Sequence, residues 1–134
     1  MIDFNKLKEI FLSNDSFVIT THVNPDADAI GSEIAVYQIL KMLKKRISVI
    51  NYSETPYYLD FLDEDKVIDI FDEITHSKVI MEADVIIALD INRASRTIKM
   101  ENVITSSKNL KICIDHHEEP DDFMDYYFGE TNYS

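Results

Sequence analysis

The chain of 134 residues is long enough for one ordinary domain with a hydrophobic core. Forty-six per cent of its residues are hydrophobic and 28% are charged, a composition that excludes disordered and fibrous proteins. The 25 acidic residues against 13 basic ones give a formal net charge of −12, which argues against a protein that coats long nucleic acid.

The sequence gives no indication of an oxidising compartment or of a membrane. Its one cysteine, Cys113, cannot form a disulfide within the chain. The first ten residues place charges where a signal peptide has its apolar segment. The longest apolar runs have about five residues, far fewer than the ~20 that a membrane span needs. We therefore expect a cytoplasmic protein that binds no membrane.

The first half of the chain alternates predicted helices with predicted strands. Apolar residues at helical spacing predict a helix over residues 4–12, and the β-branched run FVITT predicts a buried strand over 17–21. An apolar face with basic residues at its C-terminal end predicts a longer helix over 29–45. The other elements predicted here are a strand over 47–50, a short helix over 57–62 and a short strand over 66–70.

The second half contains two continuous apolar runs, residues 84–89 and 111–114, which are typical of parallel strands covered on both faces. Residues 97–107 between them could form the crossover helix. The acidic segment after His117 is expected to be a solvated surface. Strands alternating with helices predict the fold class, an open α/β sheet that is mostly parallel and has helices on both faces.

Three of the predicted strands end in a carboxylate or in a cluster of carboxylates and histidines. They are His22, Asp26 and Asp28 after the first strand, Asp90 after the run 84–89, and Asp115, His116 and His117 after the run 111–114. Parallel strands bring their carboxyl ends to one edge of the sheet, where the ligands of open α/β folds gather. A single aspartate there is more often a turn residue, but turn chemistry does not explain three such strand ends.

The combination of carboxylates and histidines at these strand ends predicts a metal centre. Crowded carboxylates repel one another and need cations to coexist at neutral pH. Mixed Asp and His ligands without a thiolate suit Mn²⁺, Mg²⁺, Fe²⁺ or Zn²⁺, and Mn²⁺ is the first choice. Two ions about 3.5–4 Å apart would acidify a water molecule and stabilise the oxygens of a phosphoryl displacement. Asp90 is the best candidate to bridge them, and the helix that begins near Ala29 would add positive potential for anions.

Three segments resemble the first three motifs of the DHH phosphoesterases. They are THVNPDADAIGS at residues 21–32, Asp90 within ALDINRASR, and IDHH at 114–117. Their order and spacing are similar to the branch that contains oligoribonucleases (nanoRNases) and pAp phosphatases, over about residues 1–120. The resemblance implies a Rossmann-like DHH domain with two Mn²⁺ ions, or Mg²⁺ in their place. It further implies hydrolysis of short oligonucleotides, 3′-phosphoadenosine 5′-phosphate (pAp), or linear and cyclic dinucleotides.

The resemblance also implies a role for each residue of the motifs. One metal ion would be bound by His22, Asp26 and Asp90, and the second by Asp28, Asp90 and His116. Asp115 would orient the ligands, and His117 would contact the scissile phosphate as a hydrogen-bond donor or proton source. Arg93 and Arg96 follow Asp90 closely and could either contact substrate phosphate or form ordinary salt bridges.

The chain departs from the family pattern after the third motif. The fourth motif, which supplies a further aspartate, and the second, glycine-rich (DHHA1-type) domain have no counterpart in the 17 residues that follow His117. We therefore expect residues 1–134 to be a DHH domain that is incomplete at its C-terminus. We also expect this chain alone to be weakly active or inactive.

Two other functions stay open. A manganese inorganic pyrophosphatase has a similar first motif, although the predicted helix before the first strand counts against it. A noncatalytic module that binds metal and nucleotide is the second alternative. The partners expected are a short nucleotide or oligonucleotide substrate and, as one option, a second copy of the chain in a homodimer.

Overall fold

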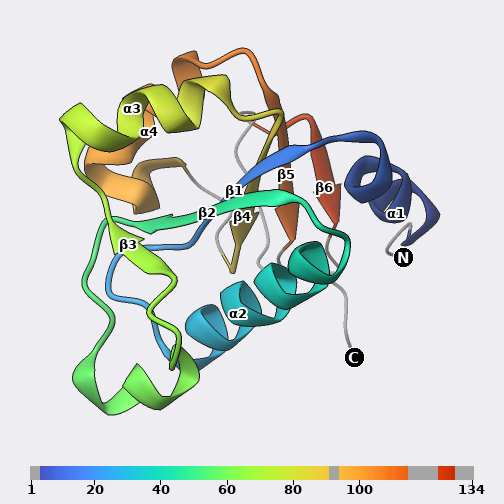
Figure 1. The fold of residues 1–134 in the computed structure, drawn as a ribbon. Coiled ribbons are helices and arrows are strands. Elements are labelled where there is room, and N and C mark those ends of the chain that lie inside the picture. The colour runs from blue at the N-terminus through green and yellow to red at the C-terminus, as the bar shows by residue number, and fades with distance from the viewer. Residues whose placement is uncertain (1–3, 91–93, 115–123, 129–134) are drawn as a thin grey trace, which may run out of the picture.

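The computed structural model describes residues 4–90, 94–114 and 124–128 (Figure 1). In this part of the chain, six strands form one sheet in the order β3-β2-β1-β4-β5-β6, and each neighbouring pair is parallel. The predicted open, parallel α/β sheet is confirmed. The strands are β1 (Ser16–Thr20), β2 (Arg46–Asn51), β3 (Ile68–Ile70), β4 (Val85–Leu89), β5 (Leu110–Ile114) and β6 (Tyr126–Phe128).

Helices cover both faces of the sheet, as predicted. Helices α1 and α2 lie on one face, and α3 and α4 lie on the other (Figure 1). Two 3₁₀ segments, η1 and η2, complete the connections. The bounds are α1 (Phe4–Ser13), α2 (Ala27–Met42), η1 (Tyr57–Leu62), α3 (Glu73–Glu82), η2 (Ala94–Met100) and α4 (Glu101–Ser106).

The central strands β1 and β4 are apolar on both faces because each face meets a helical layer. Phe17 and Ile19 pack into the cluster under α1 and α2, whereas Val18 between them packs into the cluster under α3 and α4. Ile87 and Ile86 of β4 divide in the same way. This alternation explains why the two strands appear in the sequence as unbroken apolar runs.

Helix α1 confirms the first predicted helix and ends where polar side chains satisfy its last carbonyl groups. Ser13 Oγ donates a hydrogen bond to the carbonyl of Glu9 at 2.7 Å, and Asn14 Nδ2 donates to that of Ile10 at 2.9 Å. The ring of Phe11 meets the ring of Phe17 edge to face, with centroids 5.9 Å apart. The helix therefore docks directly on β1.

The boundaries of α2 differ from the predicted helix over 29–45. It begins at Ala27, because Asp26 is its N-cap and accepts a hydrogen bond from the backbone N–H of Ala29. It ends at Met42, and Lys44 two residues later has a φ of 61°. The helical path is therefore broken before the basic run that the prediction included.

Two elements were absent from the sequence prediction. Helix α3 buries Ile80 alone among its residues, so its sequence lacks an apolar stripe. Its N-cap Asp72 accepts a hydrogen bond from Thr75 N–H at 3.0 Å. Strand β6 lies in the acidic segment expected to be solvated, and that expectation is wrong for this stretch: it pairs with β5, and Phe128 is buried.

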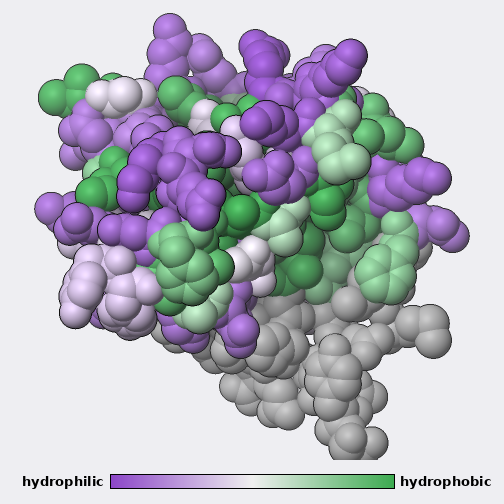
Figure 2. Space-filling view, turned by 60° about the horizontal axis from the view of Figure 1, so that its bottom comes forward, coloured by the Kyte–Doolittle hydropathy of each residue, from purple (hydrophilic) through white to green (hydrophobic). Residues whose placement is uncertain are grey.

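Apolar side chains reach the surface among hydrophilic ones on the side where α2 lies (Figure 2). Ile39 near the end of α2 and Leu43 directly after this helix, together with Phe4 and Leu12 of α1, line a groove of about 280 Å³. The sheet thus covers only part of the apolar surface of these helices. Within the described part of the chain, no helix has the length and apolar character needed to span a bilayer.

Hydrogen bonds among Asp15, Ser16 and Asp84 join the amino ends of β1 and β4. One Asp84 carboxylate oxygen accepts hydrogen bonds from the backbone N–H groups of Asp15 at 2.9 Å and Ser16 at 3.2 Å. Ser16 Oγ in turn accepts from Asp84 N–H at 2.8 Å. The backbone hydrogen bonds from Asp15 and Ser16 lower the pKa of Asp84 below its ordinary value.

Candidate metal centre

The candidate site lies at the carboxyl ends of β1 and β4, the two central strands. From β1 the chain proceeds to β2 and β3 on one side, and from β4 it proceeds to β5 and β6 on the other. Open α/β sheets bind their ligands at such a reversal of strand order. His22 follows the end of β1, Asp90 directly follows β4, and Asp26 caps the helix that begins beside them.

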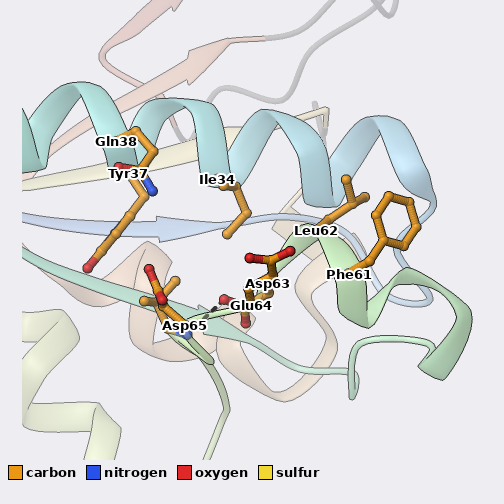
Figure 3. A pocket seen from close by; sticks show the side chains of 9 residues that line it. Ile34, Tyr37, Gln38, Phe61, Leu62, Asp63, Glu64 and Asp65 are labelled. Carbon is orange, nitrogen blue, oxygen red and sulfur yellow. Dashed lines mark hydrogen bonds between the residues drawn. The ribbon is translucent and has the colours of Figure 1, made fainter.

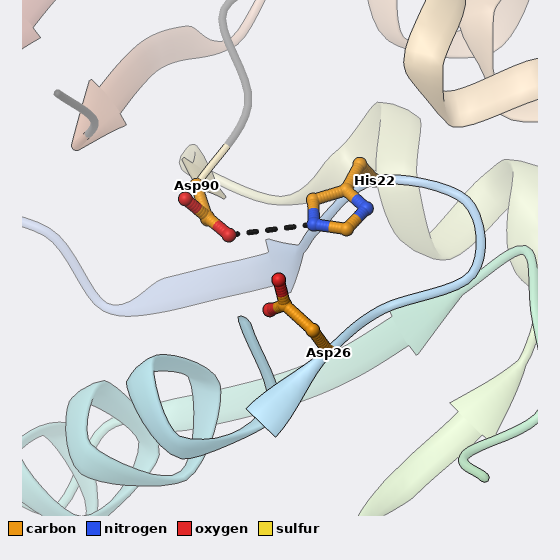
Figure 4. Close-up of side chains that lie close together, drawn as sticks. All are labelled: His22, Asp26 and Asp90. Carbon is orange, nitrogen blue, oxygen red and sulfur yellow. Dashed lines mark ion pairs between the residues drawn. The ribbon is translucent and has the colours of Figure 1, made fainter. Parts of the chain in front are cut away.

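Three side chains converge there (Figure 4). His22, Asp26 and Asp90 each present one ligand atom, and these atoms all lie within 4.8 Å of one another. His22 Nε2 is 3.3 Å from Asp90 Oδ2. The side chains of His22 and Asp90 are only 10% and 13% exposed, so water screens their interaction weakly.

A backbone carbonyl orients the imidazole of His22. Nδ1 of His22 lies 2.8 Å from the carbonyl oxygen of Val23. A carbonyl oxygen only accepts hydrogen bonds, so this contact favours a proton on Nδ1 and leaves Nε2 as the nitrogen available to a metal ion. Histidine ligands of metals commonly donate their other ring N–H to such a carbonyl oxygen. Nε2 of His22 faces Asp90, so an ion could be held by both side chains.

Asp26 has two roles in the local structure. Its Oδ1 accepts a hydrogen bond from Ala29 N–H at 2.9 Å, and its carbonyl accepts from Ile30 N–H at 3.1 Å. Its carboxylate points toward Asp90 and His22 (Figure 4). The N-terminus of α2 therefore fixes this carboxylate and adds positive potential beside it.

The two strand ends that carry His22 and Asp90 are tied together. Thr21 Oγ1, which is buried, donates a hydrogen bond to the Leu89 carbonyl at 2.7 Å. Asp90 N–H donates to the Ile114 carbonyl at 3.1 Å, and the φ of Asp90 is 55°. This left-handed turn, which aspartate tolerates better than most residues, takes the chain out of the sheet directly at the site.

The other predicted site residues do not join this group of three in the described part of the chain. Asp28 lies in the first turn of α2 with an exposed side chain and is outside the group of three. Arg96 belongs to η2, but its side chain lies outside the description. Asp115, His116, His117 and Arg93 lie outside the described residues.

The sequence prediction did not include Thr21 and the Val23 carbonyl as supports of the site. Thr21 directly precedes His22, which is a weak signal, since a strand-end threonine is common in any sheet. A backbone carbonyl gives no signal in the sequence.

A separate cleft of about 160 Å³ lies between α2 and the end of η1 with the residues that follow it (Figure 3). Asp63, Glu64 and Asp65 are consecutive carboxylates in its lining. Such a lining repels phosphate, so this cleft does not suit an anionic substrate. The carboxyl edge of β1 and β4 remains the better candidate.

Comparison with known proteins identifies the family. The sequence profile of the DHH family, N-terminal domain, matches residues 16–133. The chain belongs to the DHH family. Among solved structures it is similar to an exopolyphosphatase-related protein from Bacteroides fragilis, with 36% sequence identity and a TM-score of 0.89. The match covers 94% of this chain and 38% of that one. No match was found among the curated proteins.

The donor set of this DHH-family chain fits a divalent cation. An imidazole nitrogen and two carboxylates, with no thiolate among them, are suitable ligands for Mn²⁺, Mg²⁺, Fe²⁺ or Zn²⁺. The orientation of His22 by a backbone carbonyl strengthens this fit, because exposed acidic groups alone are common at protein surfaces. His22, Asp26 and Asp90 would hold the ion.

Proposed function

We propose that this chain carries the metal centre of a DHH-family phosphoesterase that hydrolyses short nucleotides: short oligonucleotides, pAp, or linear and cyclic dinucleotides. The convergence of His22, Asp26 and Asp90 at the carboxyl edge of the sheet is the observation that carries the proposal. We further propose Mn²⁺ as the preferred ion, two ions per site with Mg²⁺ as the alternative, and a cytoplasmic location.

The remaining motif residues complete the proposed site. Asp28 and His116 would share the second ion with Asp90, and Asp115 would orient these ligands. His117 would donate a hydrogen bond or a proton at the scissile phosphate, and Arg96 would contact a phosphate oxygen. The bound ions supply Lewis acidity and positive charge for a phosphate ester and an attacking water.

A second candidate substrate is inorganic. The Bacteroides fragilis structure is described as exopolyphosphatase-related, and a similar first motif occurs in manganese pyrophosphatases. Hydrolysis of polyphosphate or pyrophosphate would use the same three ligands, because water again attacks a phosphorus atom, here in a phosphoanhydride instead of a phosphate ester. Binding of metal and nucleotide without turnover is the third candidate, and a homodimer remains a prediction.

Substrate comparison tests the proposal. The protein, in the length that its gene encodes, is incubated with Mn²⁺ and each of four substrates: a short oligoribonucleotide, pAp, pyrophosphate and polyphosphate. We expect hydrolysis of a nucleotide substrate, and loss of more than about 100-fold of that rate in Asp90→Asn, because a shared metal ligand is removed.

Asp84→Asn is the matched control, since it makes the same chemical change at the other end of the same strand. It should leave the rate unchanged. Phosphate release from pyrophosphate or polyphosphate alone would replace the nucleotide proposal with the inorganic one. Tight nucleotide binding without turnover of any substrate, unaffected by Asp90→Asn, would support the noncatalytic module.

A further inference from the structure

Glu33 and Asn51 form a buried polar pair between α2 and β2. Both residues are fully buried, with exposed fractions of 0%. Asn51 Nδ2 donates a hydrogen bond to Glu33 Oε1 at 2.8 Å. The second carboxylate oxygen of Glu33, Oε2, and the amide oxygen of Asn51, Oδ1, are buried without a hydrogen-bond partner.

These two oxygens cannot satisfy each other while the Glu33 carboxylate is ionised, because both are then acceptors only. Leaving a buried polar atom unpaired costs about 1–3 kcal/mol, and more for a charged group. One proton on Oε2 changes this, since it turns that oxygen into a donor. The carboxylic acid and the amide are planar groups already joined by the hydrogen bond from Asn51 Nδ2 to Glu33 Oε1. A proton on Glu33 Oε2 would allow a second hydrogen bond, donated to Asn51 Oδ1.

We infer that Glu33 is a neutral carboxylic acid in the folded protein and closes a ring of two hydrogen bonds with Asn51. Asn51 is the last residue of β2, and its carbonyl accepts a hydrogen bond from Phe71 N–H at 2.7 Å. Glu33 lies in the second turn of α2, the helix that Asp26 caps. The ring thus clamps the N-terminal half of α2 to the carboxyl edge of the sheet.

The charges around Glu33 agree with this state. Burial, with a smaller contribution from the nearby Asp63 carboxylate, raises the pKa of Glu33 to about 8, although the Asn51 hydrogen bond opposes the shift. Asp63 is held in place by the backbone N–H groups of Val67 and Ile68.

Few other charges face the pair. Strands β1 and β4, which pack against α2, have no titratable side chains, and β2 has only Arg46 at its exposed first residue. Strand β3, which pairs with β2, has only the exposed Asp69. The titratable groups of α2 itself and of η1 are exposed or half-buried: Asp28, Tyr37, Lys41, Tyr57, Tyr58 and Asp60.

Carbon-13 NMR of the glutamate carboxyl groups in the full chain tests the protonation directly. Glu33→Gln identifies the Glu33 resonance by its disappearance. We expect this resonance to keep the position of a protonated acid until the pH approaches about 8, whereas exposed glutamates change near their ordinary value of 4.5. Titration of Glu33 together with the exposed glutamates would overturn the inference.

Denaturant unfolding of the same variant provides a second readout. The folded chain binds a proton that the unfolded chain releases between pH 4.5 and about 8. Its folded-to-unfolded ratio should therefore fall about tenfold per pH unit across this interval, relative to Glu33→Gln. The glutamine variant keeps both hydrogen bonds through its amide, and they do not titrate.

Glu33→Met is the control for the ring itself, because it keeps the volume but offers Asn51 no partner. It should be less stable than Glu33→Gln at every pH. Parallel pH profiles for the wild type and Glu33→Gln would contradict the inference. Neither readout involves a substrate or a metal. A failure of the inference about Glu33 can therefore be distinguished from a failure of the proposed function.

Discussion

The two ends of the central strands β1 and β4 use aspartate in opposite ways. At the amino end, one oxygen of the Asp84 carboxylate accepts hydrogen bonds from the backbone N–H groups of Asp15 and Ser16. At the carboxyl end, Asp26 and Asp90 converge on His22 within 4.8 Å. Asp84 therefore stabilises the fold through backbone N–H groups, whereas Asp26 and Asp90 face another carboxylate and an imidazole, as metal ligands do, although Asp26 also caps α2.

The largest effect is expected at Asp26. Asp26→Asn keeps the N-cap, because an asparagine oxygen accepts the Ala29 N–H equally well, but it removes the charged ligand. The affinity for Mn²⁺, measured by titration calorimetry, should fall by more than about 100-fold, since even changes to residues that only support a ligand cost 10–100-fold. The free energy of unfolding without metal should stay equal or rise, because the substitution removes the repulsion between the Asp26 and Asp90 carboxylates.

Asp84→Asn is again the control, and its affinity for Mn²⁺ should match that of the wild type. Equal losses of affinity in the two variants would mean that the carboxyl end is no more specialised than the amino end. A loss of metal-free stability in Asp26→Asn would show that the carboxylate is a structural group.

Thr21→Val should have an intermediate effect. The substitution keeps the shape of the side chain but removes the hydroxyl that donates to the Leu89 carbonyl. We expect the free energy of unfolding to fall by about 1–3 kcal/mol, the cost of a lost buried hydrogen bond. We also expect weaker Mn²⁺ binding, because this bond holds together the strand ends that carry His22 and Asp90.

Thr20→Val provides a matched comparison on the neighbouring residue. The hydroxyl of Thr20 is equally buried, but it faces the sulfur of Met100 at 4.0 Å, a weak acceptor. Its loss should cost less than the loss of the Thr21 hydroxyl in chemical denaturation, and it should not change metal affinity. The reverse order would show that the Thr21 bond does not support the site.

The smallest effect is expected for the stability of Asp84→Asn. At pH 7 its free energy of unfolding should be lower by about 0.5–1 kcal/mol, because the site is exposed and solvent screens the charge. The pKa of Asp84 is lowered in the folded state, so the stabilisation is present above the ordinary value of 3.8 and is lost as the pH falls through the folded value. The difference between the wild type and the variant should therefore shrink in acid. An equal difference at pH 7 and pH 3 would contradict this explanation.

The sequence was sufficient for the parts of the molecule that repeat a simple pattern. The apolar runs of β1 and β4 identify parallel strands, and the position of Asp90 after such a run places it at the edge where His22 and Asp26 also lie. This reasoning needs only the direction of the strands. The roles assigned to Asp28 and His116 rest on the family resemblance, and that of Arg96 rests on its closeness to Asp90 in the sequence; all three stay predictions.

Other features depend on contacts that no local pattern reports. Helix α3 buries Ile80 alone among its residues, so it needs no periodic apolar stripe that the sequence would show. Strand β6 is hidden in an acidic segment and forms because β5 offers it an edge, with Asp125 accepting from Lys111 N–H at 2.8 Å. The Glu33–Asn51 pair joins a helix to a strand through two polar residues that the sequence alone would place on a surface.

The hydrogen bond from Thr21 to Leu89 joins residues 68 positions apart in the chain. Contacts of such long sequence separation form late, because the intervening chain must first lose its freedom. During synthesis, His22 and Asp26 leave the ribosome well before Asp90, and β4 has to enter the centre of the sheet before the three ligands meet. If these three side chains bind Mn²⁺ as proposed, metal binding by a stalled chain would report whether β4 has already entered the sheet.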